Sequence, residues 1–148
     1  MNCSVARTLD IVGEWWTLLV VRDIMMGQRR FEGIQADLGI ARNILSDRLN
    51  TLVAHGVVDR VLYQEHPERY EYRLTEKGAD LFPIIAALMT WGDRWAAPDG
   101  PPLEMRHSCG ARGHATVVCS ECGETMGIGD ARMKAGPGWR AGTAAERA

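Results

Sequence analysis

The residues of this chain best suited to metal chemistry lie near its end. Residues 119–123, Cys-Ser-Glu-Cys-Gly, have the spacing that lets two thiolates point at one centre, because the glycine frees the backbone of the turn. Residues 107–110, His-Ser-Cys-Gly, offer a second and irregular turn. Together they predict one structural zinc per subunit, with the ligands His107, Cys109, Cys119 and Cys122.

Two alternatives to this zinc site stay open. The fourth ligand could instead be His114 or be absent, and the cysteines also fit reducible pairs or free thiols. A catalytic zinc is not expected, because four protein ligands leave no open position and no nearby residue offers a general base.

The fourth cysteine, Cys3, stands apart at the start of an expected helix over residues 4–12 that ends at Gly13. A helix N-terminus and the nearby Arg7 would stabilise a thiolate and raise its reactivity toward oxidants or electrophiles. Cys3 is therefore a candidate redox sensor. The alternative is an inert small residue packed near a dimer interface.

Polar side chains gather on one side of a helix expected over residues 41–55. Apolar residues recur there with helical period, and the opposite half carries polar residues. Asparagine can bond adenine and arginine can bond guanine in the major groove of DNA. We expect base-edge contacts from Arg42, Asn43, Ser46, Asp47 and Asn50, whereas Arg48 at the edge of the apolar face suits a structural or phosphate role.

The segments before this helix complete a helix-turn-helix. Residues 15–26 predict a mostly buried helix, and residues 31–38 a short helix ended by Gly39, with residues 39–42 as the turn. Arg29 and Arg30 precede the short helix and are placed for phosphate contacts. The alternative for each is an exposed, solubilising arginine.

A hairpin with a polar tip follows. Residues 57–63 and 70–74 alternate in the manner of strands, whereas residues 64–69 are polar and include Pro67, which discourages strand pairing. Arg69, with His66 near it, would hold this tip against a phosphate. A polar helix face beside such a hairpin is typical of a winged helix-turn-helix, although a small α+β unit with a solvated helix face has the same pattern.

Five segments carry a resemblance to the HxlR family of bacterial transcriptional regulators, relatives of MarR. They are CSVA at 3–6, LDIVGEWW at 9–16, RFEGI at 30–34, LSDRL at 45–49 and YEYRLTEKG at 70–78. The chain departs at Glu14, where the family more often has a basic residue before a single tryptophan. The resemblance implies dimerisation through terminal helices and, as in some members, sensing of disulfide, aldehyde or quinone stress through a cysteine at the place of Cys3.

Residues 75–97 predict one long helix, capped by Thr75 and bent at Pro83. Its apolar stripe is wider than a small domain can bury against itself, so a partner helix is expected. A homodimer would match a palindromic operator in double-stranded DNA.

The amino-acid composition limits the functions that the chain can have. The net charge of −2 counts against a simple nucleic-acid binder, so DNA binding requires the arginines to gather on one face. The 148 residues contain no apolar run of membrane-spanning length and no signal-peptide pattern, so a cytoplasmic protein is expected.

The sequence thus predicts an α+β, mostly helical fold: a winged helix-turn-helix with a long C-terminal dimerisation helix and a small Cys-containing tail. Residues 1–98 would form the DNA-binding and dimerisation domain, 99–134 a zinc-ribbon-like unit, and 135–148 a flexible terminus. The expected function is a homodimeric, sequence-specific transcriptional regulator, a repressor that responds to a small molecule or a redox signal. The alternative is a zinc-stabilised protein-interaction module without sequence-specific DNA binding. An enzyme is not expected, because no nucleophile–base pair is present.

Overall fold

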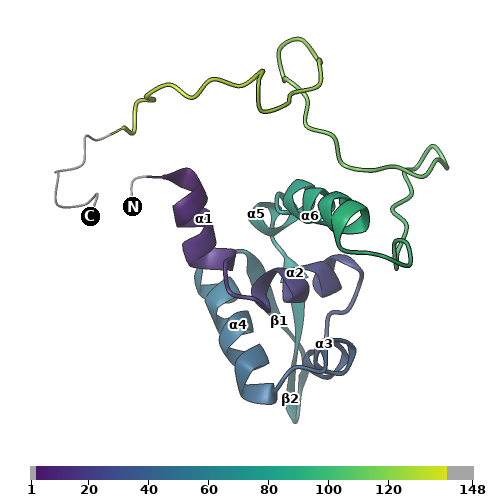
Figure 1. Ribbon diagram of the computed structural model, residues 1–148. Coiled ribbons are helices and arrows are strands. Elements are labelled where there is room, and N and C mark those ends of the chain that lie inside the picture. Colours follow the sequence, from purple (N-terminus) through teal and green to yellow (C-terminus); the bar gives the residue numbers. More distant parts are fainter. Residues whose placement is uncertain (1–2, 140–148) are drawn as a thin grey trace. The chain divides into compact units, whose positions relative to one another are not determined.

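The computed structural model describes residues 3–139. The chain divides into two units, one of residues 3–85 and one that begins at Ala86, and each is described by itself. The elements in chain order are α1 (Ser4–Val12), α2 (Thr17–Met25), α3 (Phe31–Leu38), α4 (Arg42–Ala54), β1 (Val58–Glu65), β2 (Glu68–Leu74), α5 (Glu76–Ala79) and α6 (Phe82–Trp95) (Figure 1). The predicted winged helix-turn-helix fold is confirmed.

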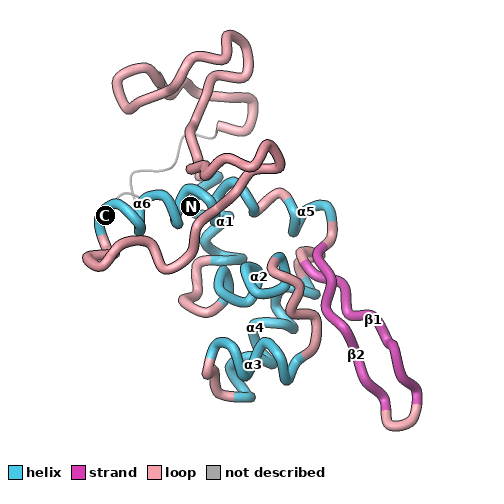
Figure 2. The backbone as a smooth tube through the Cα atoms, turned by 90° about the vertical axis from the view of Figure 1, so that its right-hand side faces the viewer, coloured by secondary structure: helices cyan, strands magenta, loops and turns pink. Residues whose placement is uncertain are grey.

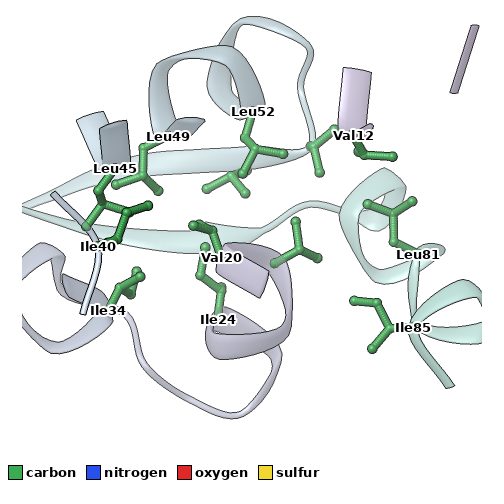
Figure 3. Packing of buried hydrophobic residues seen from close by; sticks show 13 residues of the cluster. Val12, Val20, Ile24, Ile34, Ile40, Leu45, Leu49, Leu52, Leu81 and Ile85 are labelled. Carbon is green, nitrogen blue, oxygen red and sulfur yellow. The ribbon is translucent and has the colours of Figure 1, made fainter. Parts of the chain in front are cut away.

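The core of the first unit forms between the helices and the base of the hairpin. In α4, Leu45, Leu49 and Leu52 recur on one face and are almost fully buried. They point toward buried aliphatic side chains of α2 and α3, among them Val20 and Ile34 (Figure 3). This burial holds α4 by its apolar face and leaves its polar face outward.

The wing is an antiparallel pair of strands, registered from Val58 opposite Leu74 to Glu65 opposite Glu68. It projects beyond the helices as a single hairpin (Figure 2). The prediction of an unpaired tip over residues 64–69 was wrong, because pairing continues to the end and leaves only His66 and Pro67 as the turn. Pro67 does not interrupt the ladder, since a turn residue needs no ladder N–H.

A cluster of hydrogen bonds ties the end of α4 to α5, and we call it the Thr75–Lys77 clasp. The Thr75 hydroxyl donates to the Gly56 carbonyl at 2.7 Å and accepts from the Gly78 N–H at 3.1 Å, which confirms Thr75 as a helix cap. The Lys77 ammonium donates to the His55 carbonyl at 2.8 Å. Gly56 takes a left-handed backbone (φ +64), which allows the chain to leave α4 for β1.

The prediction of one continuous helix over residues 75–97 was wrong. Helix α5 ends at Ala79, and α6 begins at Phe82 with Pro83 in its first turn. Proline has no N–H to donate and disfavours helical backbone in the residue before it, so it is tolerated where a helix starts rather than within one. The chain therefore begins a new helix at this point instead of bending the old one.

The second unit contains most of α6 and the tail that follows. Beyond α6, the described residues form turns and isolated β-bridges rather than helices or strands (Figure 2). The Thr90 hydroxyl of α6 accepts the Ala115 N–H at 2.9 Å, which holds part of the tail against this helix. Of the expected flexible terminus, residues 140–148 lie outside the described part of the chain. No helix within residues 3–139 is long and apolar enough to cross a membrane.

The packing of α5 yields a stability prediction. A Cβ added to the buried Gly78 would press against the Val57 carbonyl oxygen and the Leu74 side chain, where the backbone cannot yield. Gly78→Ala should therefore lower the free energy of unfolding by roughly 1–3 kcal/mol, seen as a lower Tm in thermal unfolding.

Gly33→Ala is the matched control. Gly33 also lies in a helix, but its added Cβ would meet only the movable end of the Gln28 side chain, at 2.6 Å from Oε1. This variant should be neutral or gain up to about 1 kcal/mol. Equal losses in the two variants would contradict the role of the contact at Gly78.

Candidate nucleic-acid interface

The outward face of α4 carries the residues expected to contact bases. Arg42, Asn43, Asp47 and Asn50 are exposed and Ser46 is half-buried. Arg42 is the first residue of the helix, after Ala41 in extended backbone. At helical spacing Asn43, Asp47 and Asn50 lie on the face opposite the buried leucines, and Arg42 and Ser46 lie toward the edge of that face. The backbone N–H groups at the helix start are nearby.

Arg42 also links the two helices of the helix-turn-helix. Its guanidinium lies over the ring of Phe31, 4.8 Å from the centroid. Phe31 begins α3, and together with Arg42, Asn43 and Ser46 it lines a surface depression of about 500 Å³. Sequence reasoning did not name Phe31 as a site residue. The available signal was an aromatic residue at a helix start directly after two arginines.

The segment before α3 pairs with the wing. The Tyr72 N–H donates to the Arg29 carbonyl at 2.7 Å, and Arg30 forms a β-bridge with Glu71. The Arg30 guanidinium lies over the ring of Tyr63 at 4.7 Å and 3.7 Å from a Glu71 carboxylate oxygen. The wing is therefore fixed to the helix-turn-helix along its length as well as at its base.

Three of the predicted phosphate-contact residues meet in one depression of about 690 Å³. Arg29, Arg30 and Arg69 line it, together with three carboxylate residues, Glu32, Glu68 and Glu71. The arginines gather on one side of the molecule, as DNA binding requires, but they do so beside an equal number of carboxylates. The local charge of the depression is consequently close to neutral.

The tip of the wing is exposed and ordered by short contacts. The ring Nδ1 of His66 lies 2.7 Å from the Glu65 carbonyl oxygen, to which it donates, so Nε2 faces away from that bond. Along the strands, Arg60 stacks on the Tyr70 ring at 3.6 Å from the centroid. The Tyr70 hydroxyl donates to Glu68 at 2.8 Å, and this bond raises the pKa of the Tyr70 hydroxyl. Arg60 and Tyr63 were missed from the sequence, although aromatic and basic residues alternate across the two strands.

Arg48 differs from the other predicted DNA-contact residues. It is half-buried, and its Nη1 lies 3.5 Å from a carboxylate oxygen of Glu14, in the loop between α1 and α2. This geometry favours the structural role considered for Arg48 over base reading. Glu14, where the chain departs from the family pattern, thus has an ion-pair partner on α4 in Arg48.

The cysteines occupy two different settings. Cys3 is the exposed N-cap residue of α1, and the backbone N–H groups of Ala6 and Val5 lower the pKa of its thiol. In the tail, the N–H groups of Cys122 and Glu121 lower the pKa of the Cys119 thiol. All four cysteines are free within residues 3–139.

The predicted zinc ligands lie on two separate turns. His107 and Cys109 belong to one, and Cys119 and Cys122 to the other. Over the described residues, no three His, Cys, Asp or Glu side chains lie close enough together to hold a metal ion. The zinc site therefore stays a prediction.

Comparison with known proteins agrees with this geometry. An uncharacterized HTH-type transcriptional regulator of Mycobacterium tuberculosis (Rv3095) is 47% identical over 140 residues, 93% of this chain and 89% of its own. The crystal structure of PA1607, a proposed transcription factor, matches with a TM-score of 0.79 and 38% identity over 89% of this chain and 94% of its own.

A third similar protein is the redox regulator HypR, whose oxidized form matches with a TM-score of 0.56 and 34% identity. The match covers 62% of this chain and 96% of HypR. Residues 11–100 match the model of the HxlR-like helix-turn-helix family, which is more than half of the chain. The chain therefore belongs to the HxlR-like helix-turn-helix family.

Proposed function

We propose that this helix-turn-helix transcriptional regulator binds a palindromic operator as a homodimer and acts as a repressor that a small molecule or a redox signal releases through Cys3. The DNA-binding part of this proposal rests on the outward polar face of α4, which lies beside the wing. The exposed Arg69 of the wing lines the same depression as Arg29 and Arg30. In this arrangement Arg42 and Asn43 at the start of α4 read base edges in the major groove, and the wing contacts the flanking backbone.

The mixed charge of the interface determines how it binds. Glu71 lies 3.7 Å from Arg30 and 3.2 Å from Arg73, so a DNA phosphate has to compete with this carboxylate for both guanidinium groups. Glu71 is half-buried, but both arginine side chains are exposed, so each guanidinium can turn from the carboxylate toward a phosphate. Non-specific affinity is then low, and discrimination depends on base contacts by α4 and on two copies binding at once.

Two helices support the homodimer. Helix α1 exposes Val5 and Leu9, with 67% and 56% of their surface accessible. Helix α6 exposes Leu88, Trp91 and Trp95 at helical spacing. Large apolar side chains gathered in this way mark an interaction surface, and a second copy of the chain is the occupant that gives two recognition helices for a palindrome.

The signal-responsive part rests on the place of Cys3. Its thiol precedes α1, the helix that carries the exposed Val5 and Leu9. Covalent change at this thiol alters the surface through which the partner binds. It would favour a dimer whose recognition helices no longer match successive major grooves. The similarity to HypR, named a redox regulator, supports this mechanism.

A second candidate function is a winged-helix protein-interaction module, stabilised by zinc, without sequence-specific DNA binding. The net charge of −2 and the three glutamates beside Arg29, Arg30 and Arg69 favour it. DNA binding by variants of α4 separates the two functions.

The double variant Arg42→Ala/Asn43→Ala should weaken binding to DNA from just upstream of the protein's own gene by about 100-fold or more, because each bidentate base contact contributes about 1–3 kcal/mol. Fluorescence anisotropy at several salt concentrations measures the affinity.

Arg69→Ala should instead weaken binding to all DNA sequences alike and reduce the slope of log affinity against log salt concentration by about 1. Arg132→Ala, which removes the same charge from the exposed tail, is the control. Unchanged affinity in the double variant would favour the interaction module.

Trp91→Asp should convert the dimer to a monomer, because it places a charge on the exposed stripe of α6. Sedimentation equilibrium should give twice the chain mass of 16.4 kDa for the parent protein and the chain mass for the variant. Trp139→Asp changes a tryptophan of equal exposure, 64%, outside α6 and should remain dimeric. A monomeric parent protein, or a dimeric Trp91 variant, would refute the α6 interface.

A quinone should release the operator from the parent protein but not from Cys3→Ser. The thiolate adds to a ring carbon, a C–S bond forms, and the ring takes up a proton to give a hydroquinone thioether. Because the pKa of Cys3 is lowered, the rate should rise with pH and level off below the ordinary thiol pKa. Ser4→Ala, which changes the neighbouring residue and keeps the thiol, is the control and should respond normally. Release that persists in Cys3→Ser would place the sensor elsewhere.

A further inference from the structure

The tail contains two hairpin turns built in the same way. In the first, Arg106 and Arg112 form a β-bridge, and the His107 N–H donates to the Ala111 carbonyl at 3.0 Å. In the second, Val118 and Thr125 form a bridge, and the Cys119 N–H donates to the Glu124 carbonyl at 2.8 Å. Each half of the proposed ligand set is therefore preformed as a turn rather than left on an irregular chain.

Each turn places a cysteine directly before a glycine with left-handed backbone. Cys109 precedes Gly110 (φ +87), and Cys122 precedes Gly123 (φ +76). The glycine N–H closes each turn, Gly110 onto the His107 carbonyl and Gly123 onto the Cys119 carbonyl. The first and second donor of each turn are thus held on the same tight loop, which is the arrangement of a metal-binding knuckle.

Two of the donor atoms, His107 Nδ1 and the Cys119 sulfur, contact backbone N–H groups of their own turns. Backbone N–H groups of Cys122 and Glu121 bond the Cys119 sulfur, and the Cys122 thiol lies within reach of it. In the first turn, the Nδ1 lone pair of His107 accepts the Cys109 N–H at 3.3 Å. That bond is long, so a metal ion can replace it at Nδ1 while Nε2 keeps its proton toward solvent.

His114 has a different environment from His107. It lines a depression formed with Met89, Thr90 and Asp93 of α6, and the residue after it is bonded to Thr90. Met105 and Arg112, beside the first turn, line the same depression, so His114 lies near both that turn and the helix but outside the loop of residues 107–110 that holds Cys109. This favours His107 as the fourth ligand.

Over the described residues, the tail has little apolar core to hold a fold. Its larger apolar side chains are exposed, among them Leu103, Val117, Ile128 and Met133. Its three cysteines are not in disulfides. Units of fewer than about 40 residues usually need a metal or disulfides to fold, because their apolar core is too small.

The similar proteins differ in whether their match to this chain includes the tail. Rv3095 and PA1607 match 93% and 89% of this chain, which extends the match into the tail. HypR matches over 96% of its own length but over only 62% of this chain. The tail is thus an addition to a regulator core that exists without it.

We propose that the tail binds one zinc ion through His107 Nδ1 and the thiolates of Cys109, Cys119 and Cys122, and that the ion draws the two turns together into a zinc ribbon. Tetrahedral coordination by one nitrogen and three sulfur atoms suits zinc and leaves no open position, so the site is structural. Because the described side chains of the tail bury little apolar surface, coordination would also contribute energy that folds the tail.

The test adds Co²⁺ to metal-free, reduced, full-length protein and follows the visible bands of tetrahedral cobalt and the near-ultraviolet thiolate bands. About one ion per chain should bind with both band types, and excess zinc should remove the bands. Elemental analysis of the protein as purified should find zinc in the same ratio.

Matched variants identify the ligands. Cys122→Ser and Cys109→Ser should lose the tetrahedral bands, and His107→Ala should weaken them, whereas Cys3→Ser and His114→Ala should retain them in full. Absence of metal in the parent protein, with Cys119 and Cys122 joined as a disulfide, would overturn the proposal. Full bands in His107→Ala with loss in His114→Ala would overturn the ligand assignment. Circular dichroism of the helices serves as a check that each variant keeps its folded core.

Discussion

The geometry of the interface depends on the Thr75–Lys77 clasp. Three successive carbonyls, those of residues 55–57, end the recognition helix and begin the wing. The Lys77 ammonium bonds the first, the Thr75 hydroxyl bonds the second, and the Thr75 N–H bonds the third at 3.1 Å. Carbonyls at a helix end have no partner within the helix, so these bonds satisfy groups that would otherwise need water. They also hold the segment between α4 and β1, where the wing begins.

The second constraint is the pairing of arginines with carboxylates on the side proposed to face DNA. Glu71 is half-buried and holds Arg30 and Arg73 near one position. Because the carboxylate holds the arginine side chains in place, less side-chain entropy is lost when a phosphate binds. The negative charge of the carboxylate also weakens the long-range attraction between these arginines and DNA. Under the proposed function, a single copy of the chain would therefore bind DNA weakly. The same balance explains why a net charge of −2 does not exclude a DNA-binding role.

Local patterns in the sequence predicted the parts of the fold that local physics determines. The leucine period of α4, the glycine at its end and the Thr75 cap are set by neighbouring residues, and all three were predicted. The length of the wing strands and the break before α6 were not predicted, because both depend on how the backbone accommodates a proline. Pro67 is compatible with a two-residue turn, and Pro83 with the first turn of a new helix. Contacts distant in sequence, such as Arg48 with Glu14 and Arg30 with Tyr63, leave no periodic signal at all.

The two cysteine settings show how one interaction can support different chemistry. At Cys3 and at Cys119, backbone N–H groups turned toward the sulfur stabilise the thiolate. Cys3 has this stabilisation alone, at an exposed helix start. Cys119 shares its turn with a second thiol, so ionising both would place two like charges together, and a divalent cation relieves that repulsion. These settings support the two proposals, a reactive thiol at Cys3 and a metal ligand at Cys119. What distinguishes the two proposed roles is the neighbouring thiol, which Cys119 has in Cys122.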